Sequence, residues 1–385
     1  MLRKIQVFLV TAVLAASAVL VADPAPAAAA PPARAGTLLS ATDITSQADT
    51  RIAGAAKVIA IRYLSPGADG HLVPVRGTVF LPTAQPKTGW RLLGFAHGTS
   101  GIGTDCTVTD RMGTGGRYDD WLGPWLRDGY VVAATEYAGI GGPGEHVYLD
   151  GETAGANLID AVRAGRTVAA RETHRPMSKG YVTEGGSQGG HASLSAGRLA
   201  EQYSGELVNV GTVANSAPLN IVEYFKLVRP GMPPVAVPDY AAYFSYVLAG
   251  LKRARPDVNV DSYLTPLGRT LIRKAQSACY QDLTPQTADV PVGDLVSRPL
   301  ADGPLIPALS AQISVPPKGF AAPVLVEQGA FDPVSPAPLT WQWVEQARGN
   351  GVTVTVKDYP AGHGIGPQAD RDALAWVNGL PWPTS

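Results

Sequence analysis

The sequence has little charge and very little cysteine. Only 16% of its 385 residues are charged, and 31 Lys and Arg against 32 Asp and Glu leave a formal net charge of −1. The chain has neither a basic stripe nor an acidic tail, so we do not expect it to bind nucleic acid. The two cysteines, Cys106 and Cys279, lie far apart and have no paired histidines beside them, so they do not form a zinc site. We expect no metal in the protein.

One long apolar run is present, at the start of the chain. Arg3 and Lys4 precede apolar residues from about 5 to 21, and alanines and prolines continue to about position 35. This order is typical of a secretory signal peptide; a membrane anchor is the alternative, although the run is close to the shortest that spans a bilayer. We predict that residues 1–35 are a signal peptide and linker, and that the protein is secreted without a stable membrane anchor.

An exported chain with an even number of cysteines is expected to contain a disulfide. A bridge between Cys106 and Cys279 would close a very long loop. In the chain-entropy model, closing such a loop stabilises the folded protein by at most on the order of 5 kcal/mol. Two buried thiols are the alternative.

Beyond residue 35, short β-rich runs alternate with segments of helical spacing. Strands are predicted at 58–63, 73–81, 92–96, 130–136, 180–185, 207–215, 323–329 and 352–359. Helices are predicted at 120–126, 152–170, 187–202, 339–347 and 371–377, the first of them capped by Asp120. Strands that alternate with helices imply an α/β fold, with a mostly parallel sheet covered by helices on both faces.

The interval 217–317 interrupts this alternation. It is rich in proline and contains helical pieces such as "PDYAAYFSYVLAGLKRA", without a clear succession of strands. Because it lies between two predicted sheet strands, we interpret it as an inserted helical cap. The core is then made of residues 36–216 and 318–385.

The stretch "YVTEGGSQGGHAS" places a serine at a glycine-rich junction between a predicted strand and a predicted helix. Gly185, Ser187 and Gly189 form the pattern G-x-S-x-G of a nucleophile elbow. Neighbours without a Cβ atom avoid clashes in so tight a turn, which presents the serine hydroxyl at the top of the sheet. The N–H of Gln188, at the helix start, then faces a developing oxyanion. A glycine-rich turn with an incidental serine is the alternative.

An acid and a base are expected after the nucleophile, in the order serine, acid, histidine. Of six histidines, only His363 follows the last predicted strand in a glycine-lined loop, "YPAGHGIG", and Asp332 follows the penultimate strand in "VLVEQGAFDPVSP". We predict a catalytic triad in which His363 accepts the proton of Ser187 and Asp332 orients and stabilises the imidazole. His191, one turn after Ser187, is expected to have a structural role.

A second oxyanion donor is expected in the loop after the third strand of the sheet. In "GFAHGTSGIG", His97 and Gly98 would turn the chain, so that the N–H of Thr99 or Gly98 points into the site. Losing one such donor costs roughly 3 kcal/mol of transition-state stabilisation. A glycine turn beside a packed histidine is the alternative.

The segment "GIGGPG", residues 139–144, matches the glycine pattern of dinucleotide-binding loops. Pro143 interrupts it, and the next helix does not begin until near Glu152, so no helix N-terminus meets the glycines. We therefore interpret it as a loop beside the active site and expect no cofactor.

Together, "AHGTSG" followed by Cys106, "YAGIGGPGEHVYLDGETAGANLIDAVRAG", "GGSQGGHAS", "GAFDPVSP" and "GHG" resemble the secretory lipase family in their order and in the size of the cap between them. This α/β-hydrolase group includes lipase A-type enzymes of yeasts and exported actinobacterial esterases. The resemblance covers nearly all of the chain beyond the signal. It implies hydrolysis of carboxylic esters, typically acylglycerols, with Ser187, Asp332 and His363 in the triad positions. It also implies that the cap forms an acyl-chain tunnel and lid, through which the protein would contact a lipid interface.

Two positions depart from the family pattern. Gly186 stands where relatives usually carry a histidine or tyrosine before the nucleophile, and Glu136 stands where they usually carry an aspartate. Both changes would reshape the substrate pocket. Within the cap, four apolar or aromatic side chains share one helical face, which either packs on the core or contacts an acyl chain: Tyr240, Tyr243, Phe244 and Val247.

Two other functions stay open. An exported serine exopeptidase would use the same fold and triad but would need paired carboxylates to hold the substrate amine. The carboxylates of the cap are instead dispersed, at Glu223, Asp239, Asp257 and Asp261. The other alternative, a non-catalytic binding protein that retained the fold, is opposed by the complete set of triad residues.

Overall fold

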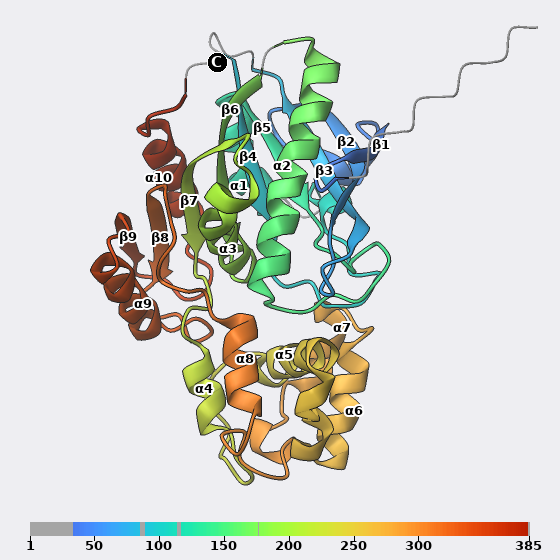
Figure 1. The fold of residues 1–385 in the computed structure, drawn as a ribbon, viewed down its shortest axis with the longest axis vertical. Helices are drawn as coiled ribbons and strands as arrows, with labels where there is room; N and C mark the ends of the chain where they lie inside the picture. Colours follow the sequence, from blue (N-terminus) through green and yellow to red (C-terminus); the bar gives the residue numbers. More distant parts are fainter. Residues whose placement is uncertain (1–33, 85–88, 114–116, 176, 384–385) are drawn as a thin grey trace, which may run out of the picture. The chain divides into compact units, whose positions relative to one another are not determined.

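The computed structural model describes residues 34–84, 89–113, 117–175 and 177–383, so residues 1–33 of the predicted signal segment lie outside the described residues. Within these ranges nine strands form one sheet, in the order β1-β2-β3-β5-β4-β6-β7-β8-β9 (Figure 1). The strands are β1 (Leu38–Asp43), β2 (Ala55–Pro66), β3 (Leu72–Pro82), β4 (Trp90–Ala96), β5 (Tyr130–Thr135), β6 (Met177–Gly186), β7 (Val208–Asn215), β8 (Val324–Gly329) and β9 (Val354–Tyr359).

The sheet is mostly parallel, as the alternation of strands and helices predicts. From β5 through β4, β6, β7 and β8 to β9, each neighbouring pair is parallel, whereas β1, β2 and β3 add an antiparallel edge. The carboxyl ends of the parallel strands therefore lie at one edge of the sheet, which is where ligands bind in open α/β folds. Strand β1 was not predicted, because most of its residues are exposed and give no apolar alternation.

Helices cover both faces of the sheet, because successive side chains of each strand point to opposite sides. On β4, Leu93 packs in one apolar cluster with residues of α1 and α10, whereas Leu92 packs in another with residues of α2. Leu194 of α3 shares a further apolar cluster with Trp343 of α9. These helices are α1 (Arg117–Arg127), α2 (Gly151–Thr173), α3 (Gln188–Tyr203), α9 (Ala337–Gly349) and α10 (Pro367–Asn378).

Local capping explains where two of the helices begin. The Asp150 carboxylate caps α2 by accepting the Thr153 hydroxyl at 2.6 Å and the Thr153 N–H at 3.4 Å. The predicted cap at Asp120 is wrong, because α1 begins at Arg117 and Asp120 lies inside its first turn. A carboxylate there still interacts favourably with the helix dipole.

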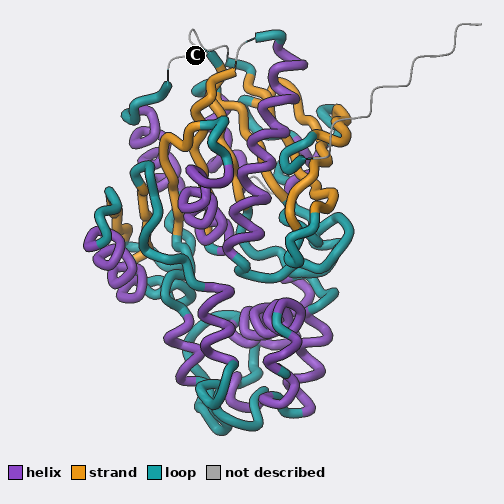
Figure 2. The backbone as a smooth tube through the Cα atoms, in the orientation of Figure 1, coloured by secondary structure: helices purple, strands orange, loops and turns teal. Residues whose placement is uncertain are grey.

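Between β7 and β8 the chain builds a separate group of helices: α4 (Val222–Leu227), α5 (Tyr240–Ala254), α6 (Pro266–Ala275), α7 (Tyr280–Thr287) and α8 (Leu305–Ile313). Figure 2 shows these helices gathered beyond one end of the strands. They enclose their own apolar core, in which Phe244 is fully buried and stacks on Phe225 with ring centroids 5.9 Å apart. None of the helices in the described ranges is long and apolar enough to cross a membrane.

The predicted disulfide is confirmed. Cys106 and Cys279 are bridged, with their Cα atoms 5.2 Å apart and a separation of 173 in the sequence. Cys106 lies in the loop after β4, and Cys279 immediately precedes α7. Beside the bridge, the N–H of Tyr280 donates to the carbonyl of Ser100 at 2.8 Å. The helical insert is therefore fastened to the loop that contains the predicted oxyanion donors.

Candidate active site

The serine of the glycine-rich junction occupies a strained turn between β6 and α3. Ser187 has φ 56° and ψ −121°, a backbone conformation that residues other than glycine rarely adopt. A Cβ atom at Gly185 would lie 2.5 Å from the carbonyl oxygen of Ala96, and one at Gly189 would overlap the same oxygen. Both positions thus require glycine, which is why the G-x-S-x-G pattern folds in this way.

Backbone hydrogen bonds hold the turn on both sides. The N–H of Ser187 donates to the Asn215 carbonyl at the end of β7, at 2.8 Å, and the Ser187 carbonyl accepts from the N–H of His191 at 3.1 Å. The serine is therefore fixed to the neighbouring strand and to the first turn of α3. Strain is retained only where surrounding structure determines the conformation, and these contacts provide that structure.

The acid and the histidine predicted downstream are brought together. His363, after β9, lies with Nδ1 2.8 Å from Oδ2 of Asp332, after β8. The other carboxylate oxygen of Asp332 accepts the backbone N–H groups of Val334 at 2.8 Å and Ser335 at 2.9 Å. These bonds fix the carboxylate and assign the proton of neutral His363 to Nδ1. Nε2 is then the nitrogen with a free lone pair.

Ser187 and His363 both line one cavity of about 440 Å³. Ser187 also lines a second, smaller cavity of about 50 Å³, which extends beneath the helical insert. Its lining is mainly apolar and aromatic: Tyr148, Leu149, Pro218, Ile221, Tyr224, Phe225, Val237, Tyr240, Tyr243, Val247, Val334 and Ser335. Of the four α5 side chains predicted to share a face, Tyr240, Tyr243 and Val247 line this cavity, whereas Phe244 packs within the insert.

The residues predicted as oxyanion donors lie around the serine. Gln188 is the first residue of α3, where backbone N–H groups have no partner within the helix. In the loop after β4, a Cβ atom on Gly98 would lie 3.4 Å from the Gly186 carbonyl and 3.9 Å from the Ser187 Cβ, so this loop passes close to the turn. The hydroxyl of Thr99 is hydrogen-bonded to that of Tyr148 at 2.6 Å.

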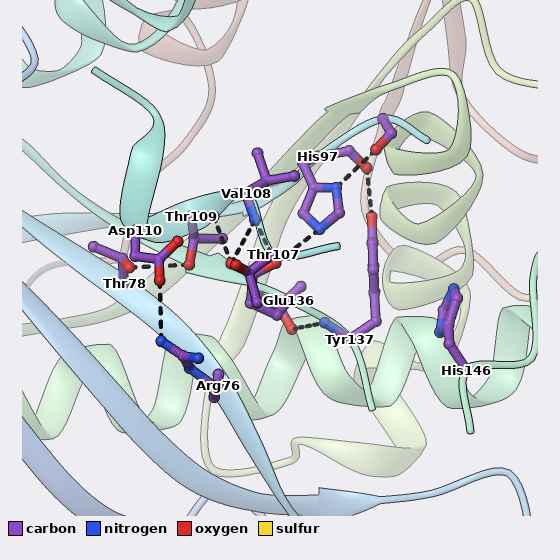
Figure 3. Close-up of polar contacts among 12 residues, drawn as sticks. Arg76, Thr78, His97, Thr107, Val108, Thr109, Asp110, Glu136, Tyr137 and His146 are labelled. Atoms are coloured by element: carbon purple, nitrogen blue, oxygen red, sulfur yellow. Dashed lines mark hydrogen bonds and ion pairs between the residues drawn. The ribbon is translucent and has the colours of Figure 1, made fainter. Parts of the chain in front are cut away.

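A buried pair beneath this loop was only partly anticipated (Figure 3). Nε2 of His97 lies 3.4 Å from the carboxylate of Glu136, whose oxygens also accept the N–H groups of Val108 and Thr109. Burial by itself would raise the pKa of Glu136, but the neighbouring His97 ring and Thr109 outweigh burial and lower it. An ionised Glu136 therefore holds the loop after β4 in place from within, while Tyr137 donates its hydroxyl to the His97 carbonyl at 2.7 Å.

Sequence reasoning missed the role of His146. Its Nε2 lies 2.9 Å from the side-chain nitrogen of Gln188, its Nδ1 lies 3.2 Å from the Ala138 carbonyl, and its ring stacks on Tyr137. Burial lowers the pKa of His146 to about 4, so the ring is neutral and its Nε2 accepts the hydrogen bond from Gln188. No sequence signal links two residues so far apart. His146 thus positions the residue that carries a predicted oxyanion donor.

His191, expected to be structural, is fully buried and contacts the insert. Its Nε2 lies 2.9 Å from the carbonyl of Ile313 at the end of α8. Burial lowers the pKa of His191 to about 4, so the neutral ring donates to this carbonyl. His191 therefore joins the helix that follows Ser187 to the last helix of the insert.

The parallel sheet, the strand-turn-helix junction at its carboxyl edge and the order of serine, acid and histidine define an α/β-hydrolase fold. Comparison with solved structures agrees. Lipase A of Candida antarctica in its closed state has a TM-score of 0.67 at 18% identity and covers 86% of this chain and 78% of that one. The rice cell wall degrading esterase LipA of Xanthomonas oryzae has a TM-score of 0.72 at 18% identity, over 90% of this chain and 95% of that one.

Sequence comparison points to the same family as the motifs. Residues 118–290 match the family described as secretory lipase. Lipase A of Moesziomyces aphidis is 24% identical over 155 residues, which make up 40% of this chain and 30% of that protein. The chain is therefore similar to the secretory lipase family over these residues, in agreement with the resemblance of its motifs, and it matches less than a third of the length of this curated relative.

Proposed function

We propose that the protein is a secreted serine hydrolase that cleaves carboxylic esters, acylglycerols among them, through an acyl-enzyme on Ser187. The observation that carries this proposal is the cavity that Ser187 and His363 both line, with Asp332 hydrogen-bonded to Nδ1 of the histidine. The similarity of residues 118–290 to the secretory lipase family supports the same class of substrate.

In the first half of the reaction, Nε2 of His363 accepts the hydroxyl proton as Ser187 attacks the ester carbonyl. The Asp332 carboxylate stabilises the imidazolium that forms. The N–H of Gln188 and one from the Gly98–Thr99 loop hold the oxyanion, since both segments lie beside the serine. His363 then returns its proton to the alcohol oxygen, which leaves, and water hydrolyses the acyl-enzyme by the same steps.

We assign residues 217–317 the role of a cap that encloses the acyl chain and faces a lipid surface. The apolar cavity beneath α5, which begins at Ser187, supports this role. That cavity is small, so a long acyl chain requires the helices of the insert to move outward, as lids do in other enzymes.

The test is a nitrophenyl ester series from acetyl to palmitoyl, measured with the wild type and with Ser187→Ala. We expect turnover by the wild type and its loss, by at least about a thousandfold, in the variant. Ser195→Ala is the matched control, because the hydroxyl of this buried serine of α3 donates to the His191 carbonyl, its one partner among the described residues, and the serine lines neither cavity.

Two results would contradict the proposal. Turnover of peptide arylamides in place of esters would favour an exopeptidase of the same fold. Equal and negligible turnover by wild type and Ser187→Ala, with retained ligand binding, would favour a binding protein.

A further inference from the structure

The two cavities that Ser187 lines receive different parts of an ester under the proposed function. The larger cavity is also lined by His363, and the smaller one is not. The histidine gives its proton to the oxygen of the departing alcohol, so that oxygen lies beside His363. The larger cavity therefore receives the alcohol part, and the apolar cavity beneath the insert receives the acyl part.

Part of the larger cavity borders open space. Gly364 and Gly366, in the loop after β9, belong to its lining. A Cβ atom added to either glycine would have no atom of the described residues within 4 Å. Groups of a bound alcohol that extend toward this loop therefore meet little obstacle.

The boundary beside the nucleophile is tight by contrast. Trp121 of α1 and Gly186, which directly precedes Ser187, both line the cavity. A Cβ atom on Gly186 would lie 2.6 Å from Cη2 of Trp121 and 3.5 Å from both Cζ2 and Cζ3. Carbon atoms in ordinary contact lie about 3.5 to 4.0 Å apart, so the edge of the six-membered ring leaves no room there for even one methyl group. Trp121 thus limits the cavity within one residue of the reacting serine.

The ring of Trp121 is held from the side of the sheet. Its N–H donates to Oε1 of Glu184 at 2.9 Å, and the ring packs edge-on against Phe95 with centroids 5.0 Å apart. Glu184 and Phe95 belong to β6 and β4 in the middle of the sheet, and both are fully buried. Displacing a close-packed side chain costs packing energy, so this wall does not yield to a substrate as an open loop does.

We propose that Trp121 determines which alcohols the enzyme accepts, so that esters of unbranched primary alcohols are preferred to isomers with a bulky group near the ester oxygen. The inference rests on the proposed function and specifies its substrate class. A linear alcohol extends toward the loop after β9, whereas a group with bulk on all sides presses against Trp121 whichever way it turns. Glu184 does not line the cavity and is a positioning residue, because it holds the indole.

The experiment compares two isomeric esters, pentyl butyrate and 2,2-dimethylpropyl butyrate. Both alcohols are primary and have the same formula, so the esters differ in shape and hardly in polarity. Their hydrolysis by hydroxide without enzyme gives the ratio that intrinsic reactivity sets. Relative to this reference, we expect the wild-type kcat/KM to favour the pentyl ester by at least about tenfold, the lower range for a misfit of one carbon in a pocket.

Variants of the wall and of its support test the assignment. Trp121→Phe removes the ring edge that faces Gly186, so the preference should fall toward one; Trp121→Met, whose flexible side chain fills core space, replaces it if the first variant does not fold. Glu184→Leu removes the acceptor of the indole N–H and should weaken the preference, whereas Glu184→Gln keeps an acceptor oxygen and should retain it. A full preference without the indole overturns the inference.

Trp125→Phe is the matched control. Trp125 lies one turn further along α1, is fully buried in the same apolar cluster as Trp121 and does not line the cavity. This variant loses the same atoms from the same helix, so its ratio of the two kcat/KM values should match that of the wild type. An equal loss of preference in Trp125→Phe would assign the effect to the packing of α1 and overturn the role of Trp121.

The remaining outcomes separate the two proposals. Serine-dependent hydrolysis of both isomers in the ratio found with hydroxide overturns the role of Trp121 and leaves the esterase function intact. Failure to hydrolyse these esters and the whole nitrophenyl series refutes the proposed function, and the inference with it.

Discussion

Glu327, on the buried strand β8, should make the protein less stable as the pH rises. Its Oε1 accepts the Tyr359 hydroxyl at 2.9 Å, but Oε2 has no hydrogen-bond partner among the described residues. Burial, more than any neighbouring group, raises the pKa of this carboxyl from 4.5 to about 8. The folded protein therefore keeps a proton on Glu327 between these two pH values, whereas the unfolded chain loses it.

The sign and size of the effect follow from this difference. The stability that the protonated carboxyl contributes is complete below pH 4.5 and is lost progressively as the pH rises toward 8. One pKa unit corresponds to about 1.4 kcal/mol, so the loss over the whole window is about 5 kcal/mol. Glu327→Gln keeps an acceptor for Tyr359 and carries no proton to lose. Its free energy of unfolding should exceed that of wild type by about 3 to 5 kcal/mol at pH 8 and differ little at pH 5.

Urea denaturation at pH 5 and pH 8 measures both values. Glu345→Gln is the control, because this glutamate on α9 has a side chain 71% exposed and should show no such pH dependence relative to wild type. A difference between Glu327→Gln and wild type that is the same at both pH values would refute the reasoning, since it would reflect packing and not the proton.

Two further predictions concern the loop after β4 and the oxyanion side of the site. Replacing Cys106 and Cys279 together by serine removes the closure of a loop of 173 positions, so the free energy of unfolding should fall by up to about 5 kcal/mol in urea titrations, whereas added reductant should leave the variant unchanged. His146→Phe keeps a ring against Tyr137 but removes the acceptor for the Gln188 side chain; kcat should fall about tenfold with little change in KM, and an unchanged kcat would exclude a positioning role.

The features that could be predicted from the sequence are those encoded by local pattern. The turn around Ser187 is readable because Gly185 and Gly189 are required by contacts within one strand-turn-helix unit. The meeting of Asp332 with His363 follows from chain order, since both come after neighbouring parallel strands that end at one edge. Apolar residues that recur with a period of two or of 3.6 likewise predict the strands of the sheet and the helices that cover it. They do not predict β1, whose exposed residues show no such period.

Features that depend on distant partners could not be predicted. His146 and Gln188 are 42 positions apart, and nothing in the intervening sequence indicates that one side chain hydrogen-bonds to the other. In the sequence Glu136 stands out only as a departure from a family pattern, yet it is buried against His97 and supports the loop that approaches Ser187. Burial of an ionisable group, and hence its pKa, arises from tertiary packing and has no local signature.

The contrast between the two cavities bears on which part of an ester governs specificity. The acyl side measures about 50 Å³ and is bounded by Tyr240 and Tyr243 of α5, so its capacity depends on how far the insert moves. The larger cavity contains His363, which returns the proton to the alcohol under the proposed function, so it is the alcohol side; it measures about 440 Å³, and its wall, Trp121, is fixed by the buried Glu184. A fixed pocket discriminates by shape and charge, whereas a pocket that opens accepts a range of chain lengths at the cost of displacing α5. Acyl length should therefore change the rate gradually, while added bulk on the alcohol should lower the rate sharply once it meets the ring of Trp121.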